Sequence, residues 1–140
     1  MISFNYETDF ELSNETQLSN WIVSVIESEN KTIGEICYVF CDDEYLLKLN
    51  NEHLKHDTLT DIISFDYSIG NEISGDIFIS IERVIDNAND FNTSFNNELN
   101  RVIIHGILHY CGYKDKTIKD KQNMRNKEDE KLEMFHVEQK

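Results

Sequence analysis

The sequence predicts a single small α+β domain, with about four strands in a mixed sheet packed against about five helices. Segments with apolar residues at every second position are interspersed with segments in which apolar residues recur every three or four positions. Two of the predicted strands are joined by a short loop that contains glycine, which is typical of a hairpin. The length of 140 residues accommodates one core, so we expect residues 1–140 to form one domain.

The first half of the chain contains two predicted strands and two predicted helices. Alternating apolar residues over residues 2–6 predict a half-buried strand. A helix is expected to begin near residues 13–14, because apolar residues recur at helical spacing after them. Residues 34–41 are rich in β-formers, which predicts a second strand, and Asp42 or Asp43 can cap the helix that follows. The expected core face of that helix consists of Leu46, Leu47, Leu49 and Leu54.

A hairpin is expected in the middle of the chain. Residues 61–67 and 73–81 have the composition and alternation of strands. Gly70 and Asn71 lie between them and favour a turn. On the second strand, one face carries Ile77, Ile79 and Ile81.

Three helices are expected after the hairpin. The first spans residues 82–89. Thr93 or Ser94 can cap the second, which ends at Gly112, where a left-handed residue is needed. The tail is expected to form an amphipathic helix with its charges on a solvated face. The apolar residues of that helix are Met124, Leu132 and Phe135.

The composition excludes several classes of protein. With 27 acidic and 13 basic residues, the net charge is −14. Broad binding to nucleic acid needs basic residues that neutralise phosphates, so this net charge argues against it. A small local site with a metal ion and a few lysines stays compatible with the charge. No apolar run approaches the ~18 residues of a membrane span, and residues 1–10 lack the basic region of a secretory signal. Three cysteines are too few for a disulfide framework, so we expect a cytoplasmic protein.

The residues most indicative of chemistry lie between positions 105 and 115. His105 and His109 are four positions apart on a predicted helix, so both imidazoles project from one face. Gly112 ends that helix and lets the chain turn back, which can bring Asp115 to the same ion. Two histidines and one carboxylate are a known ligand set for catalytic zinc, with a fourth position for water. We therefore expect His105, His109 and Asp115 to bind one divalent metal ion, with zinc favoured.

Two other interpretations of this segment stay open. Histidines four apart also occur on helix faces where both merely hydrogen bond to their neighbours. The offsets of His105, His109, Gly112 and Asp115 match those of the metzincin peptidases. Those peptidases need a glutamate directly after the first histidine as general base. Gly106 occupies that position, so a peptidase is disfavoured and the general base is not identifiable.

Three motifs in chain order resemble those of the YbeY-type endoribonucleases, the rRNA maturation factors. The family signature His-Gly-x-Leu-His-Leu-x-Gly-Tyr-Asp-His resembles residues 105–115. A block of threonine, aspartate, two aliphatic residues, serine and phenylalanine resembles residues 60–65, and a Gly-Asp-Ile-x-Ile-Ser block resembles residues 75–80. These motifs span residues 57–115, and outside that range the resemblance rests on length and element order.

The resemblance implies a single-strand-specific, metal-dependent endoribonuclease in ribosomal RNA maturation and ribosome quality control. It implies single-stranded ribosomal RNA and the ribosomal subunit or ribosome-associated proteins as partners, and no membrane. The family builds its zinc site from three histidines. His105 and His109 match two of them, and Asp115 stands at the third position, where aspartate is a competent zinc ligand. The alternatives are a ribosome-associated factor with a structural metal and, less favoured, a small metallopeptidase.

The segment before the predicted hairpin is the expected substrate-binding loop. The family carries an arginine there, where this chain has Leu54. Lys55 can supply the positive charge but not the bidentate fork of arginine. We expect Lys55, His56 and Thr60 to contact the substrate. Asp61 fits either of two roles, as a carboxylate that holds a ligand histidine by its other ring nitrogen or as a turn cap.

Overall fold

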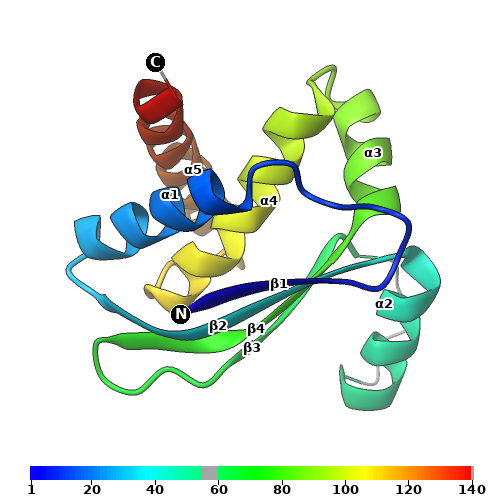
Figure 1. Ribbon diagram of the computed structural model, residues 1–140, viewed down its shortest axis with the longest axis horizontal. Helices are drawn as coiled ribbons and strands as arrows, with labels where there is room; N and C mark the ends of the chain where they lie inside the picture. Colours follow the sequence, from blue (N-terminus) through cyan, green and yellow to red (C-terminus); the bar gives the residue numbers. More distant parts are fainter. Residues whose placement is uncertain (55–59, 140) are drawn as a thin grey trace.

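Four strands form a mixed sheet, as the sequence predicts (Figure 1). The computed structural model describes residues 1–54 and 60–139. In their order across the sheet, the strands are β1 (Ile2–Tyr6), β2 (Thr32–Cys41), β4 (Glu72–Ser80) and β3 (Ile62–Asp66). Strand β2 pairs parallel with β1 and β4, and β3 pairs antiparallel with β4. The predicted hairpin is therefore confirmed, and β3 lies at an edge of the sheet.

Five α-helices in the described part of the chain pack around the sheet, which confirms the predicted α+β class. They are α1 (Glu15–Ser28), α2 (Asp43–Leu49), α3 (Ile81–Asp90), α4 (Phe95–Tyr110) and α5 (Ile118–Gln139), and a π-helical segment, η1 (Asn50–Leu54), follows α2. Helices α1, α4 and α5 lie on one side of the sheet, and α2 lies toward the other side (Figure 1). No helix among the described residues combines the length and the apolar character needed to cross a membrane.

Short polar side chains fix where several helices begin. Asp42 and Ser94 each accept a hydrogen bond from the backbone N–H three positions later, at 2.9 Å and 3.1 Å. Both predicted caps are therefore confirmed. Ile81, which the alternating pattern assigns to a strand, instead begins α3. The reason is that Ser80 Oγ accepts a hydrogen bond from a backbone N–H of α3, so the strand ends at this cap.

The C-terminal helix α5 docks through its apolar face, as the sequence predicts. Met124, Leu132 and Phe135 are 2%, 6% and 6% exposed. The Phe135 ring stacks on Trp21 of α1 with ring centroids 4.6 Å apart. The indole N–H of Trp21 donates a hydrogen bond to the Lys131 carbonyl at 2.8 Å. These contacts hold α5 against α1. Helix α5 also packs against α4, so side chains on the inner face of α5 can contact α4.

Candidate metal centre

Helix α4 presents two histidines on one face. Its opposite face is buried in the core, where Ile103 and Ile107 are fully enclosed, and this fixes the rotation of the helix. His105 and His109 lie one turn apart on the other face. Their Nε2 atoms are 3.0 Å apart, and the ring planes meet edge to face. Both histidines line one pocket beside β3.

A turn after α4 brings a carboxylate to the two imidazoles. Gly112 has φ +106°, in the left-handed region that glycine adopts without a steric penalty. Two backbone hydrogen bonds of 3.0 Å close this turn. Asp115 Oδ2 then lies 3.2 Å from His109 Nε2 and 3.3 Å from His105 Nε2. The structure thus brings together the three residues that the sequence suggests as ligands, and we call them the ligand triad.

The spacing of the ligand triad fits a zinc-sized ion. Zinc–nitrogen and zinc–oxygen bonds of ~2.0–2.1 Å separate the corners of a regular tetrahedron by about 3.3–3.4 Å. The three donor atoms here are 3.0–3.3 Å apart. They form the one group of histidine, cysteine and acidic side chains within the described residues that meets the spacing of a metal site. The group could therefore hold a divalent ion on one triangular face, leaving the opposite side to the pocket.

A carboxylate from α5 orients the first histidine, and the sequence analysis does not identify it. Glu128 Oε2 lies 2.6 Å from His105 Nδ1, and Glu128 is 5% exposed. Because a carboxylate accepts a hydrogen bond, the proton resides on Nδ1 and Nε2 presents its lone pair to the triad. Burial disfavours the charged imidazole, but the hydrogen bond and charge of Glu128, with the charge of Asp115, outweigh it and raise the pKa of His105.

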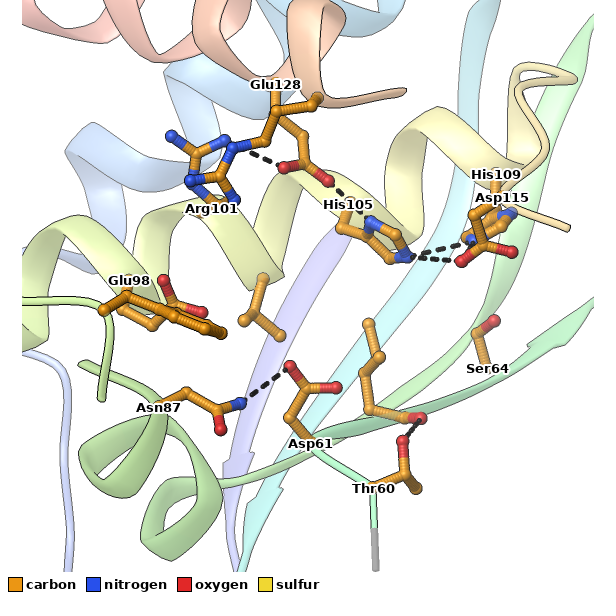
Figure 2. Close-up of a pocket in the computed structure, with 14 residues that line it drawn as sticks. Thr60, Asp61, Ser64, Asn87, Glu98, Arg101, His105, His109, Asp115 and Glu128 are labelled. Carbon is orange, nitrogen blue, oxygen red and sulfur yellow. Dashed lines mark hydrogen bonds and ion pairs between the residues drawn. The ribbon is translucent and has the colours of Figure 1, made fainter. Parts of the chain in front are cut away.

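Arg101 holds Glu128 in turn. Its Nη1 donates to Glu128 Oε1 at 2.9 Å, and its Nη2 donates to Asp129 Oδ1 at 2.7 Å (Figure 2 draws the first of these pairs). The expectation that the charges of the tail lie on a solvated face is therefore wrong for Glu128, because the docked stripe of α5 includes it. The sequence offers one signal for this burial, since Glu128 lies four positions from both Met124 and Leu132.

The ligand triad opens into a pocket of about 460 Å³ that α3, α4, α5 and β3 line (Figure 2). Two further acids face this pocket. Burial raises the pKa of Asp61, although the charge of His105 opposes the shift. Burial also raises the pKa of Glu98, and the nearby charge of Asp61 adds to it, while Arg101 and Arg125 oppose it. Acids with raised pKa values beside a histidine pair are typical of functional sites.

The residues expected to contact substrate are only partly within the described chain. Thr60 lines the pocket, and its hydroxyl donates to the Ile62 carbonyl at 3.2 Å. Lys55 and His56 lie outside the described residues.

Asp61 occupies the pocket without bonding to a ligand histidine. Its Oδ2 accepts a long hydrogen bond of 3.4 Å from Asn87 Nδ2, as Figure 2 shows. Of the two roles that the sequence leaves open for Asp61, the first is filled by Glu128, whose carboxylate reaches the other ring nitrogen of His105.

Position 106 is tightly packed against the sheet, which disfavours the general base of a zinc peptidase there. A Cβ added to Gly106 lies 3.0 Å from Ile77 Cδ1 and 3.3 Å from Ile62 Cδ1. A glutamate there must enter the apolar contact between α4 and the sheet, where burial of a charge is costly. The packing adds to the sequence argument against a peptidase mechanism.

Comparisons with known proteins agree with the motifs. A family model described as Endoribonuclease YbeY matches residues 3–136. A protein of Flavobacterium johnsoniae named endoribonuclease YbeY is 68% identical over 139 residues, which are 99% of this chain and 100% of that protein. A protein of the same name from Karelsulcia muelleri is 46% identical over 140 residues, which are 100% of this chain and 98% of that protein.

A solved structure also resembles this chain. The protein TM1509 of Thermotoga maritima, determined in solution, superposes with a TM-score of 0.70 at 25% sequence identity. The match covers 99% of this chain and 91% of that one. The fold of the described residues therefore resembles that of a known structure.

Proposed function

Because the chain belongs to the endoribonuclease YbeY family, we propose that it is a single-strand-specific, metal-dependent endoribonuclease that acts in ribosomal RNA maturation and ribosome quality control. The observation that carries the metal dependence is the convergence of three donor atoms within 3.0–3.3 Å of one another. We further propose that residues 1–140 act as one domain, that the ion is a single zinc, and that the protein works in the cytoplasm with the ribosomal subunit or ribosome-associated proteins.

His105, His109 and Asp115 are the residues that would hold the ion. When bound, a divalent ion polarises a phosphoryl oxygen and lowers the pKa of its water. Glu128 would hold the proton of the neutral His105 imidazole on Nδ1, so Nε2 would be the donor atom to the ion. Asp61 faces the same pocket, and burial raises its pKa, which favours a group that can take up or return a proton.

A local site reconciles RNA binding with the net charge of −14. Arg125 lies in the lining of the pocket and is exposed, so it can neutralise a phosphate near the ligand triad. Thr60 lines the same pocket and supplies a hydroxyl. With Lys55 and His56, it remains our proposal for contacts with the substrate.

Cleavage of a labelled single-stranded RNA by the purified protein tests this function. The zinc-loaded wild type is expected to cut it, and to leave a duplex of the same sequence intact. His109→Ala removes one of three ligands, so its rate should fall by more than the roughly 10–100-fold typical of outer-shell changes. His136→Ala is the matched control, because His136 is exposed on α5. Equal cleavage by wild type and His109→Ala would overturn the proposal.

Two observations favour a second candidate, a ribosome-associated factor in which the metal is structural. The chain is strongly acidic, and Leu54 stands where the family resemblance places an arginine. In that case co-sedimentation with ribosomal subunits should survive His109→Ala, while purified protein shows no metal-dependent RNA cleavage.

A further inference from the structure

The pocket continues beyond the ligand triad along α4. His105 and Glu98 are seven residues apart on that helix, which is about 10.5 Å along its axis. Figure 2 shows Glu98 and Asn87 at one end of the pocket and His109 with Asp115 at the other. The end near Glu98 takes no part in holding a metal ion. We call it the distal end of the pocket.

Glu98 is a buried acid whose carboxylate has no hydrogen-bond partner in the described part of the chain. It lies in the first turn of α4, is 4% exposed and lines the pocket. By contrast, Glu128 uses both carboxylate oxygens, one on Arg101 and one on His105. Every fully enclosed side-chain oxygen among the described residues has a hydrogen-bond partner. The Glu98 carboxylate oxygens have no such partner, so they are not fully enclosed and stay accessible from the pocket. A buried carboxylate of this kind is costly unless a ligand donates a hydrogen bond to it.

An exposed aromatic ring and a guanidinium line the same pocket as this acid. Phe91 follows the last turn of α3, lines the pocket and is 59% exposed. Arg125 of α5 also lines the pocket, its charge acts on Glu98, and it forms no ion pair with another described residue. An aromatic face for stacking, a cation for a phosphate and a hydrogen-bond acceptor, all in one pocket, match the parts of a nucleotide.

We propose that the distal end is a nucleobase subsite in which Phe91 stacks on the base, Glu98 accepts a hydrogen bond from an exocyclic amino group, and Arg125 contacts the adjoining phosphate. This inference rests on the proposed function, since it specifies the RNA that the site takes. The subsite favours cytosine, adenine or guanine over uracil. Uracil has no amino group, and the carbonyls on both sides of its N3–H repel a carboxylate.

Nucleotide binding tests the subsite separately from cleavage. The probes are 5′-CMP and 5′-UMP, titrated into the full chain and followed by NMR, because neither has an internal phosphodiester bond. CMP is expected to bind about tenfold more tightly than UMP. Glu98→Gln should remove that preference, because an amide both donates and accepts. Phe91→Leu should weaken both nucleotides. The matched controls are Glu133→Gln, an exposed acid on α5, and Tyr67→Leu, an aromatic residue that is also 59% exposed.

The outcomes separate this inference from the proposed function. Equal binding of CMP and UMP by the wild type, or affinities unchanged in Phe91→Leu and Glu98→Gln, would overturn the subsite even if the protein cleaves RNA. Selective CMP binding that both variants impair would support the subsite, and loss of RNA cleavage would then count against the proposed function alone. Phe91 is exposed, so its variant keeps the test valid if Glu98→Gln fails to fold.

Discussion

Replacing Glu128 with glutamine should weaken zinc binding, although Glu128 is not itself a member of the ligand triad. Its carboxylate contacts His105 Nδ1 at 2.6 Å and Arg101 Nη1 at 2.9 Å, and the residue is 5% exposed. Glutamine has nearly the same shape but no charge. The imidazole therefore loses a charge-assisted hydrogen bond and becomes a poorer electron-pair donor at Nε2.

The size of the effect follows from these contacts. Outer-shell substitutions of this kind lower metal affinity by about 10–100-fold, or roughly 1.4–2.7 kcal/mol. Among the described residues, the substitution also leaves Arg101 with Asp129 as its one charged partner, and the Asp129 side chain is 57% exposed. Breaking a buried ion pair costs about 3–5 kcal/mol, but the amide oxygen and Asp129 keep partial contacts, so we expect the metal-free protein to lose about 1–3 kcal/mol of stability.

Zinc competition with a chromophoric chelator measures the affinity. Glu128 raises the pKa of His105, so removing its charge lowers that pKa and reduces the competition between protons and zinc. This effect opposes the expected one, and a titration at about pH 8 minimises it. Asp129→Asn is the control, because it removes the exposed partner of Arg101 without contacting His105. Wild-type affinity in Glu128→Gln, or equal losses in both variants, would refute the reasoning.

Three other predictions concern the triad, the turn and the attachment of α5. Purified wild type should contain near-equimolar zinc and Asp115→Ala much less by elemental analysis; equal contents would remove Asp115 from the site. Gly112→Ala should cost about 1–2 kcal/mol in urea unfolding and also weaken zinc binding, because φ is +106° and the turn positions Asp115. Gly70→Ala, at φ +60°, should cost similar stability but leave zinc affinity unchanged. Burial opposes ionisation of Glu29, but its hydrogen bond from Lys131 prevails and lowers the pKa of Glu29. Ionised Glu29 therefore stabilises the folded protein fully above the ordinary glutamate pKa, and this stabilisation is lost as pH falls through the lowered pKa. Glu29→Gln should therefore destabilise by about 1–3 kcal/mol at neutral pH and much less in acid, and a pH-independent loss would contradict this.

Much of the fold could be predicted because its signals are local. The alternation in residues 61–67 and 73–81 identifies both hairpin strands, and Ser94 identifies the start of α4. The prediction that Ile81 belongs to the strand is wrong, because isoleucine continues the alternating pattern while the preceding Ser80 caps a helix. The strand order across the sheet could not be predicted, because it depends on pairing between segments distant in sequence.

By itself, the sequence determined the spacing that makes a metal centre plausible. His105 and His109 share a helix face because α-helical geometry requires it, and Gly112 permits the left-handed turn before Asp115. These are properties of neighbouring residues, and they need no knowledge of the rest of the chain.

Only the tertiary structure decided what surrounds that centre. Glu128 lies 23 positions after His105 and reaches it because α5 docks through its apolar stripe. Glu98 in α4 and Phe91, which directly follows α3, share one pocket because α3 and α4 pack together. Such contacts depend on how whole elements bury their apolar faces. The local pattern places Glu128 on the apolar stripe of α5, but only the packing of α5 on α4 brings its carboxylate to His105.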